Sequence, residues 1–394
     1  MTSNDQPYGA PTGPAADPAA DPAADPAAGA AVPGAASLSY PCQACGATVE
    51  FAPGSDAMRC PYCGQEQAVT SVPRQVREHS WDELAMLPAK PRGSVPAGVR
   101  AYVCPGCAAH TETDDLSARC QFCATALVAE PDATERVAPE AVVPFGLDRN
   151  NAREALRKWT SSRWFAPSSL KKVSEAETFK GSYLPHWTYD AETVSHYRGQ
   201  RGQYYYVTET YTTTENGESV TKTREVRHTR WFAASGTVSR DFDDVLVAGT
   251  NHVATKQLDK LTPWPLEEAK PFQPEYLAGF QTVRYDVEPE DGLVTAKERM
   301  ADVITRDCRS DIGGDEQRVH SVDTRYSGLT FKLMLLPVWF LTYLYAGKSW
   351  QVMVNARTAE VIGERPYSKG KIAAAVVAAL VVVAAIVLVV VRQR

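Results

Sequence analysis

Eight of the nine cysteines form four C-x2-C pairs in the first third of the chain. The first two pairs follow the pattern C-x2-C-x14-C-x2-C, and the other two follow C-x2-C-x12-C-x2-C. A zinc ion with four thiolate ligands is tetrahedral, and a C-x2-C pair on a tight turn places two sulfurs along one edge of the tetrahedron. The stretch between two pairs is long enough for a hairpin that returns the second turn to the first. Both sets therefore have the zinc-ribbon pattern, with the predicted ligands Cys42, Cys45, Cys60, Cys63, Cys104, Cys107, Cys120 and Cys123.

The metal predicted at these cysteines is zinc, as two structural ions that are each closed by four ligands. An iron–sulfur cluster uses the same ligands, but paired turns with this spacing favour zinc. In the first ribbon, Gly46 and Gly64 follow the second cysteine of each pair and relax the turn. The second ribbon has Ala108 and Ala124 at these places. Its turns are therefore expected to be less ideal, and whether it is fully metallated stays open.

The N-terminus has no charged segment followed by an apolar core, so no secretory signal is predicted. We therefore expect the bulk of the chain to lie in the cytoplasm, where thiols stay reduced and paired cysteines bind metal rather than form disulfides. The ninth cysteine, Cys308, lies in a helical pattern and is expected to be an inert apolar residue.

Residues 372–391 are twenty uncharged residues, all Ile, Ala, Val or Leu, and they are long enough to cross a bilayer. They follow Lys369 and Lys371 and end close to the C-terminus, which predicts a single membrane-spanning tail anchor in contact with lipid. Residues 333–347 are also apolar, but this segment is short and contains a proline. We expect it to be a buried strand.

The region between the ribbons and the tail combines helical and strand patterns. Asp148 is placed to cap a helix that starts with the next residue, and residues 290–309 form a second helical pattern with Leu293, Met300, Val303 and Ile304 on one side. Asn216 and Gly217 predict a two-residue hairpin turn that pairs Val207 with Val226 and Glu209 with Arg224. The segments FKGSYLPHWTY at 179–189 and FKLMLLPVWFL at 331–341 share Phe, Lys, Leu, Pro and Trp, which indicates an internal repeat.

The predicted fold class is α+β: two small zinc ribbons, a β-rich α+β domain with an internal repeat, and one C-terminal transmembrane helix. The expected boundaries are 1–39 for a disordered arm rich in Ala, Pro and Asp, 40–72 for ribbon 1, 73–99 for a linker with a short helix, 100–130 for ribbon 2, 137–366 for the α+β domain with its two FKxxxLPxW units, and 372–391 for the span.

No catalytic motif stands out, and we expect no enzymatic activity and identify no small-molecule substrate. Gly347, Lys348 and Ser349 imitate the end of a phosphate-binding loop, but Thr342 occupies the position of its first glycine and the next residues alternate like a strand. Nucleic-acid binding is not favoured, because residues 40–130 contain seven Lys and Arg against ten Asp and Glu.

Beyond the cysteines, the segments YLPHWTYDAETVSHYRGQRG, PEYLAGF and LPVWFLTYLYAGKSWQVMVNARTAEVIGERP and the apolar tail resemble the bacterial membrane-anchored tandem zinc-ribbon proteins of largely unknown function. Some members of that family are encoded beside phage-shock-type membrane-stress proteins and are thought to tether them. The resemblance implies a non-catalytic adaptor that recruits a protein partner to the cytoplasmic face of the cytoplasmic membrane. The alternative is a membrane-anchored zinc-ribbon protein that binds nucleic acid. The likeness to helicase and transcription-factor ribbons covers the cysteines alone, and it implies no helicase activity.

Overall fold

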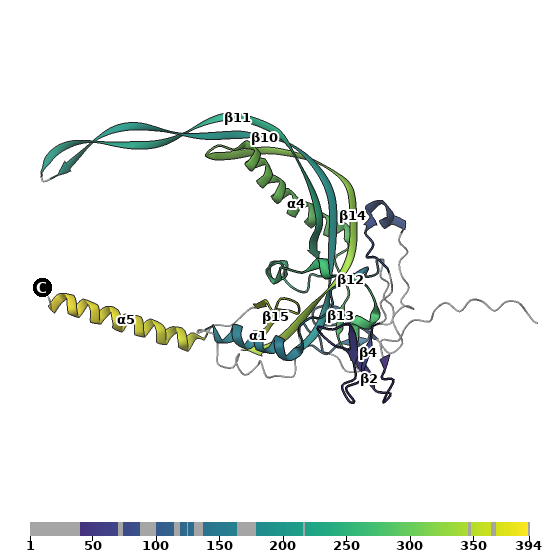
Figure 1. Ribbon diagram of the computed structural model, residues 1–394. Helices are drawn as coiled ribbons and strands as arrows, with labels where there is room; N and C mark the ends of the chain where they lie inside the picture. Colours follow the sequence, from purple (N-terminus) through teal and green to yellow (C-terminus); the bar gives the residue numbers. More distant parts are fainter. Residues whose placement is uncertain are drawn as a thin grey trace, which may run out of the picture. The chain divides into compact units, whose positions relative to one another are not determined.

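The computed structural model describes residues 40–69, 74–86, 100–113, 119–123, 125–129, 137–163, 179–215, 217–345, 348–363 and 368–392. The expected disordered arm, 1–39, and Asn216 of the predicted turn lie outside these residues. Within the described part, helices and strands are mixed and strands form most of the body (Figure 1). The predicted α+β fold class is confirmed.

The first ribbon is a small antiparallel sheet in the order β1-β2-β3-β4. Its strands are β1 (Tyr40–Pro41), β2 (Thr48–Phe51), β3 (Ala57–Arg59) and β4 (Glu66–Ala68). Alternating residues of β2, Val49 and Phe51, are buried in one core with Tyr276 and Phe145 of the body. The backbone N–H of Phe51 also donates to the carbonyl of Ala278, 3.0 Å away. The first ribbon is therefore fixed to the body by apolar packing and a backbone hydrogen bond.

A second sheet, twelve-stranded among the described residues, contains the second ribbon and the body. Its main path is β12-β9-β14-β10-β13-β7-β6-β8, and β5, β11, β15 and β16 pair with members of that path or with each other. The bounds are β5 (His79–Ser80), β6 (Arg100–Val103), β7 (His110–Thr113), β8 (Val128–Ala129), β9 (Ala141–Val142), β10 (Phe179–Glu215), β11 (Glu218–Ala248), β12 (Lys270–Pro271), β13 (Gln281–Val283), β14 (Glu316–Tyr345), β15 (Lys348–Asn355) and β16 (Val361–Gly363). Because β7 of the second ribbon pairs with β13, the ribbon is continuous with the sheet of the body.

Three long strands form the centre of the body, where β10 pairs with β11 on one side and with β14 on the other. The β10–β11 hairpin continues as two strands beyond the start of β14 (Figure 1). Val207 opposes Val226 and Glu209 opposes Arg224, as predicted, and the guanidinium of Arg224 donates to the Glu209 carboxylate at 3.1 Å. The predicted hairpin register is confirmed. Residues 333–341 of β14 are almost entirely buried, which also confirms the strand predicted there.

Two helices cover parts of this sheet. In α1 (Arg149–Ser161), the Asp148 carboxylate accepts from the backbone N–H of Asn151 at 2.8 Å, so the predicted cap is confirmed. The helix α4 (Pro289–Ile312) lies beside the long strands (Figure 1), and its residues Leu293, Met300 and Ile304 are buried in one core with residues of those strands. The remaining short helices are η1 (Trp81–Met86), α3 (Thr255–Leu258), η3 (Asp259–Leu261), η4 (Leu266–Glu268) and η5 (Pro274–Leu277).

The expected short helix of the linker is the 3-10 helix η1. Ser80, the residue before this helix, belongs to β5 and opposes Thr330 of β14. The Glu83 carboxylate binds the guanidinium of Arg77 at 2.9 Å. The structure therefore uses these two residues to attach the linker to the body and to pair charges.

The two repeated segments, 179–189 and 331–341, pair with each other along their whole length in antiparallel register. Phe179 opposes Leu341, and Tyr189 opposes Phe331. The central residues of the two copies, Leu184 and Leu336, oppose each other. An antiparallel pair of like segments with like residues at its centre is related by a local twofold axis.

Neighbouring elements follow the same twofold relation. The short strand β9 runs parallel to β14 at Met334 and Leu335, and β13 runs parallel to β10 at the equivalent residues Ser182 and Tyr183. A helix follows each short strand, α1 after β9 and α4 after β13. Each half therefore places its short strand against the long strand of the other half.

The tryptophan that the two copies of the repeat share has a structural role. The indole N–H of Trp187 donates to the carbonyl of Val287, 2.8 Å away, and that of Trp339 donates to the carbonyl of Leu147, 2.9 Å away. Val287 and Leu147 each lie two residues before the helix of the opposite half begins. The two tryptophans thus fix the starts of α4 and α1 in equivalent ways.

Candidate metal centres

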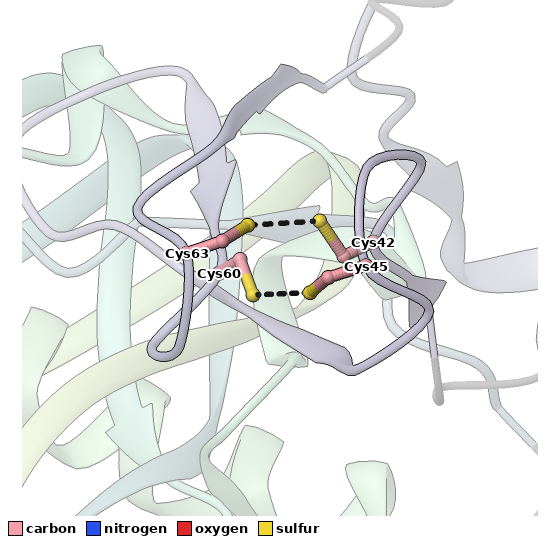
Figure 2. A group of neighbouring side chains, drawn as sticks. All are labelled: Cys42, Cys45, Cys60 and Cys63. Atoms are coloured by element: carbon pink, nitrogen blue, oxygen red, sulfur yellow. Dashed lines mark hydrogen bonds between the residues drawn. The ribbon is translucent and has the colours of Figure 1, made fainter.

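The four cysteines of the first ribbon lie on two loops that face each other (Figure 2). Cys42 and Cys45 come from the loop between β1 and β2, and Cys60 and Cys63 come from the loop between β3 and β4. The sulfurs of Cys42 and Cys63 are 3.5 Å apart, and those of Cys45 and Cys60 are 3.6 Å apart. All four sulfurs lie within 4.8 Å of one another. The structure brings together all four residues predicted for this ribbon.

The second ribbon has the same arrangement. The sulfurs of Cys104 and Cys123 are 3.3 Å apart, and those of Cys107 and Cys120 are 3.5 Å apart. Again all four sulfurs lie within 4.8 Å of one another. The two sets of predicted ligands therefore form two separate four-cysteine groups.

The distances between sulfurs fit a metal ion better than a covalent bond. A disulfide needs sulfurs about 2.05 Å apart, and all nine cysteines are free. A tetrahedral zinc ion with bonds of about 2.3 Å places its sulfur ligands about 3.8 Å apart. Sulfurs that already lie 3.3 to 3.6 Å apart need only a small outward shift to reach this geometry. Each group can hold one zinc ion.

Backbone and hydroxyl groups favour the thiolate form in both groups. The backbone N–H of Cys63 lowers the pKa of the Cys60 thiol to about 6, and the N–H of Tyr62 acts in the same direction against the effect of burial. Burial opposes ionisation of Cys123, but hydrogen bonds from the side chain and backbone of Thr125 outweigh it and lower the pKa of that thiol to about 7. In the first centre the pKa of the Cys42 thiol is lowered too, whereas in the second centre burial raises the pKa of Cys107 to about 11. Because the thiolate is the metal ligand, each centre has at least one cysteine prepared to bind near neutral pH.

The turns that follow the cysteine pairs show why the second ribbon is expected to be less ideal than the first. Gly46 and Gly64 have φ values of 74° and 75°, in the left-handed region that glycine adopts freely. Ala108 adopts nearly the same conformation, with φ of 60°, and its backbone N–H donates to the carbonyl of Cys104 at 2.7 Å. A residue with a Cβ is strained in this region. Ala124, the other alanine in question, lies outside the described residues.

The two centres differ in how deeply the protein covers them. In the first, Cys45 and Cys63 are exposed, and the side chain of Tyr62 between the last two cysteines is 82% exposed. In the second, Phe122 is buried and packs edge-on against Phe340 of β14, with ring centroids 5.5 Å apart. The carbonyl of Phe122 also accepts a hydrogen bond from the side chain of Gln351 in β15. The second centre is thus held by the body, whereas the first presents its turns to solvent.

An acidic group in the body was not found from the sequence. The carboxylates of Glu78, Asp190, Asp243 and Asp244 lie within 4.8 Å of one another. The ammonium of Lys332, a lysine of the FKxxxLPxW repeat, is 2.9 Å from Glu78 and 2.6 Å from Asp244. Burial raises the pKa of Asp190 to about 6. Because the buried Lys332 already occupies the group as its cation, these residues form a partly exposed ion-pair network. Asp243 and Asp244 are neighbours in the chain, but nothing in the sequence relates them to Glu78.

The tail forms α5 (Lys369–Arg392), and the backbone N–H of Lys371 in its first turn donates to the hydroxyl of Ser368, the residue before the helix. An 18-residue window within Gly370–Arg392 has a mean hydropathy of 3.4, and none of that window is buried against the rest of the described chain. Residues 372–391 therefore lie in one helix that is long and apolar enough to cross a membrane, which supports a single-pass anchor.

Comparison with known proteins gives one relative of note. The chain is 26% identical over 340 residues to the uncharacterized protein YdjG of Bacillus subtilis (strain 168). The match covers 86% of this chain and 92% of that protein. No protein-family profile matches the chain. No solved structure matches it. Because the match spans 340 residues, it extends beyond the cysteine-containing region.

Proposed function

We propose that the protein is a non-catalytic membrane-tethered adaptor whose first zinc ribbon binds a protein partner. The tail helix α5 holds the assembly at the membrane, with the bulk of the chain on the cytoplasmic side. By the resemblance given above, the partner is a membrane-stress protein of the phage-shock type. The proposal includes no enzymatic activity, because four thiolates fill the coordination shell of each zinc and leave no position for a substrate.

One observation carries this proposal: the first ribbon is anchored on one side and open on the other. Phe51 and Val49 are buried against the body, while Tyr62 projects from the zinc-binding turn with 82% of its surface exposed. Tyrosine is enriched among the residues that dominate protein–protein interfaces, because it offers a large rigid contact area with a polar end. A tyrosine held by a metal-stabilised turn is therefore a suitable anchor for a partner.

The charges around the first ribbon favour protein over nucleic acid. Arg59 binds Glu66 at 2.5 Å, and Arg77 binds Glu83 at 2.9 Å. Arg74 also forms an ion pair, with Glu140. Nucleic-acid binding needs several basic side chains available to phosphates. Three arginines that would have to supply this charge are already neutralised by carboxylates of the chain.

The test is co-purification with the full chain in detergent, comparing the unaltered protein with Tyr62→Ala and with the control Tyr206→Ala. Tyr206 is also exposed, at 62%, but lies in the β10–β11 hairpin. We expect the partner to be retained by the unaltered chain and the control and weakened at least about thirtyfold by Tyr62→Ala, the effect of losing one dominant interface residue. Equal retention by all three proteins would contradict the role of the first ribbon.

A second measurement separates the adaptor from the nucleic-acid alternative. Fluorescence anisotropy of labelled single- and double-stranded oligonucleotides with the full chain at low salt should show no binding. Micromolar binding that weakens steeply as salt rises would favour the alternative, because this dependence reports release of counterions from phosphates. The orientation is tested by adding protease to intact cells, which should leave the ribbons uncut.

A further inference from the structure

The tail helix restricts where the body can be. β16 ends at Gly363 and α5 begins at Lys369, so residues 364–368 are the whole connection. Even fully extended, this connection reaches only about 20 Å. If α5 spans the bilayer, the end of β16 and the elements packed on it lie close to the lipid headgroups.

Besides its partner strand β15, β16 contacts α1 and the short helix η3. The buried residues Ala152 and Leu156 of α1 share one apolar core with Val361 of β16 and Val352 of β15. The helix contacts both of these strands directly. The short connection therefore brings α1, rather than a distant part of the body, within reach of the membrane surface.

The outward side of α1 is basic, although the whole chain has a formal net charge of −6. The segment from Asp148 to Arg163 has two acidic residues, Asp148 and Glu154, and five basic residues: Arg149, Arg153, Arg157, Lys158 and Arg163. Asn150, Asn151, Arg153, Glu154 and Arg157 line an open depression along the helix. An anionic surface would repel most of this protein but attract this side of α1.

Some basic side chains of the body are paired with carboxylates. Arg240 binds Asp307 and Arg299 binds Asp259, at 2.5 and 2.7 Å. Arg153, Arg157 and Lys158 have no carboxylate partner among the residues that the structure describes, and the Nε of Arg153 is buried there without an acceptor. Three cations on one helix that no described carboxylate neutralises are suited to bind an anion outside the protein.

We propose that α1, through Arg153, Arg157 and Lys158, lies on the anionic phospholipid headgroups of the membrane that α5 spans. Lipid phosphates supply the missing acceptors, and each Lys or Arg at an anionic surface contributes about a fivefold change in partition. Trp159, whose ring lies 5.3 Å from the guanidinium of Arg163, is half-buried at the end of the helix and of the type found at membrane interfaces. This second attachment would hold the body in one orientation on its short tether. It requires α5 to be the anchor but does not require the adaptor role.

The experiment uses the full chain in nanodiscs, because α5 then fixes the protein to the disc and only the contact of α1 varies. Hydrogen–deuterium exchange of residues 149–161 is compared in discs of phosphatidylcholine and in discs with about one third phosphatidylglycerol, which supplies the surface charge. We expect several-fold slower exchange in the anionic discs. About 0.5 M salt should abolish the difference, because it reduces the Debye length to a few ångströms.

The test variant carries Arg153→Gln, Arg157→Gln and Lys158→Gln, substitutions that preserve helix propensity. Its matched control carries Lys222→Gln, Arg227→Gln and Arg230→Gln in β11 and loses the same charge. The protection by anionic lipid should disappear in the test variant and persist in the control. Equal exchange in both kinds of disc, protection retained by the test variant, or protection lost in the control would each overturn the proposal. Incorporation into the discs measures the anchor separately, and zinc content reports that both variants are folded.

Discussion

Leu184 of β10 lies directly opposite Leu336 of β14, and each is the central residue of its copy of the repeated segment. The repeat therefore forms one continuous paired unit around a local twofold axis, instead of two modules that fold side by side. Because of this relation, a substitution in one copy can be compared with the same substitution at the equivalent position of the other copy.

Replacing either repeat tryptophan by phenylalanine should destabilise the protein by similar amounts. Trp187→Phe and Trp339→Phe each leave one partly buried carbonyl, that of Val287 or Leu147, without its indole donor. The expected loss is about 1–3 kcal/mol in each case. Urea unfolding followed by circular dichroism measures it. Trp231→Phe, at a partly exposed position, is the control and should have little effect. Clearly unequal losses at Trp187 and Trp339 would show that the two environments differ energetically.

The buried His186 should make the protein less stable in mild acid. Burial lowers the pKa of His186 to about 4, whereas in the unfolded chain a histidine titrates near 6.5. Between these pH values the unfolded chain binds the extra proton, so stability falls as the pH is lowered, by about 2 kcal/mol at pH 5.

Valine occupies the equivalent position in the second copy, as Val338, and supplies the matched substitution. His186→Val should show a smaller loss of stability between pH 7 and pH 5 than the unaltered chain. The difference between the two proteins is the quantity to measure, because loss of zinc in acid affects both. Parallel pH profiles would exclude His186 as the source.

Each chain should bind two zinc ions. Cys60→Ser should lower the zinc content by one ion, since it removes a ligand of the first centre, whereas Cys308→Ser should leave both ions bound. Metal binding supplies much of the folding free energy of such small sites, and Cys60 belongs to the core shared with Tyr276 and Phe145. We therefore expect the loss of zinc to loosen the neighbouring part of the body as well. Elemental analysis is the measurement, and iron, or less than one zinc in the unaltered chain, would contradict the assignment.

Ala108→Gly should strengthen the second centre. It relieves a left-handed conformation with φ of 60° at an alanine, for a gain of up to about 1 kcal/mol. The rate of zinc transfer from the protein to a chromogenic chelator should fall. Ala109→Gly is the matched control, because Ala109 is fully buried and has no positive φ. That substitution should speed zinc release, and the prediction fails if both glycines act alike.

Deleting residues 368–394 should move the protein from the membrane to the soluble fraction. The rest of the described chain contains no other helix that is long and apolar enough to span a membrane, and residues 333–341 form a buried strand. The measurement is fractionation after washes with high salt and carbonate, which remove electrostatic contacts such as the one proposed for α1. A chain lacking residues 1–39 is the control and should stay in the membrane. Retention of the truncated chain would indicate another means of attachment.

Local patterns in the sequence predicted the elements whose partners are close in the chain. The cysteine spacing anticipated which sulfurs meet, and Gly217 with its neighbour fixed the pairing of Glu209 with Arg224. Long-range contacts were not predictable in this way. β9 and β13 are two and three residues long, too short for any periodicity, and their parallel partners depend on the twofold axis. The pairing of β7 with β13 joins the second ribbon to the body, but no pattern in the sequence of either segment indicates this pairing.

The pairing of β10 with β14 also determines the order of events during biosynthesis. Leu341 follows its partner Phe179 by about 160 residues, which at 5–20 residues per second is roughly 10–30 s of translation. During this interval Tyr183 and Trp187 have no β14 to cover them, and the nascent chain is exposed to aggregation or to capture by chaperones. The apolar tail leaves the ribosome shortly after β14. The chain therefore receives its membrane signal only when the last strand of its core has been made.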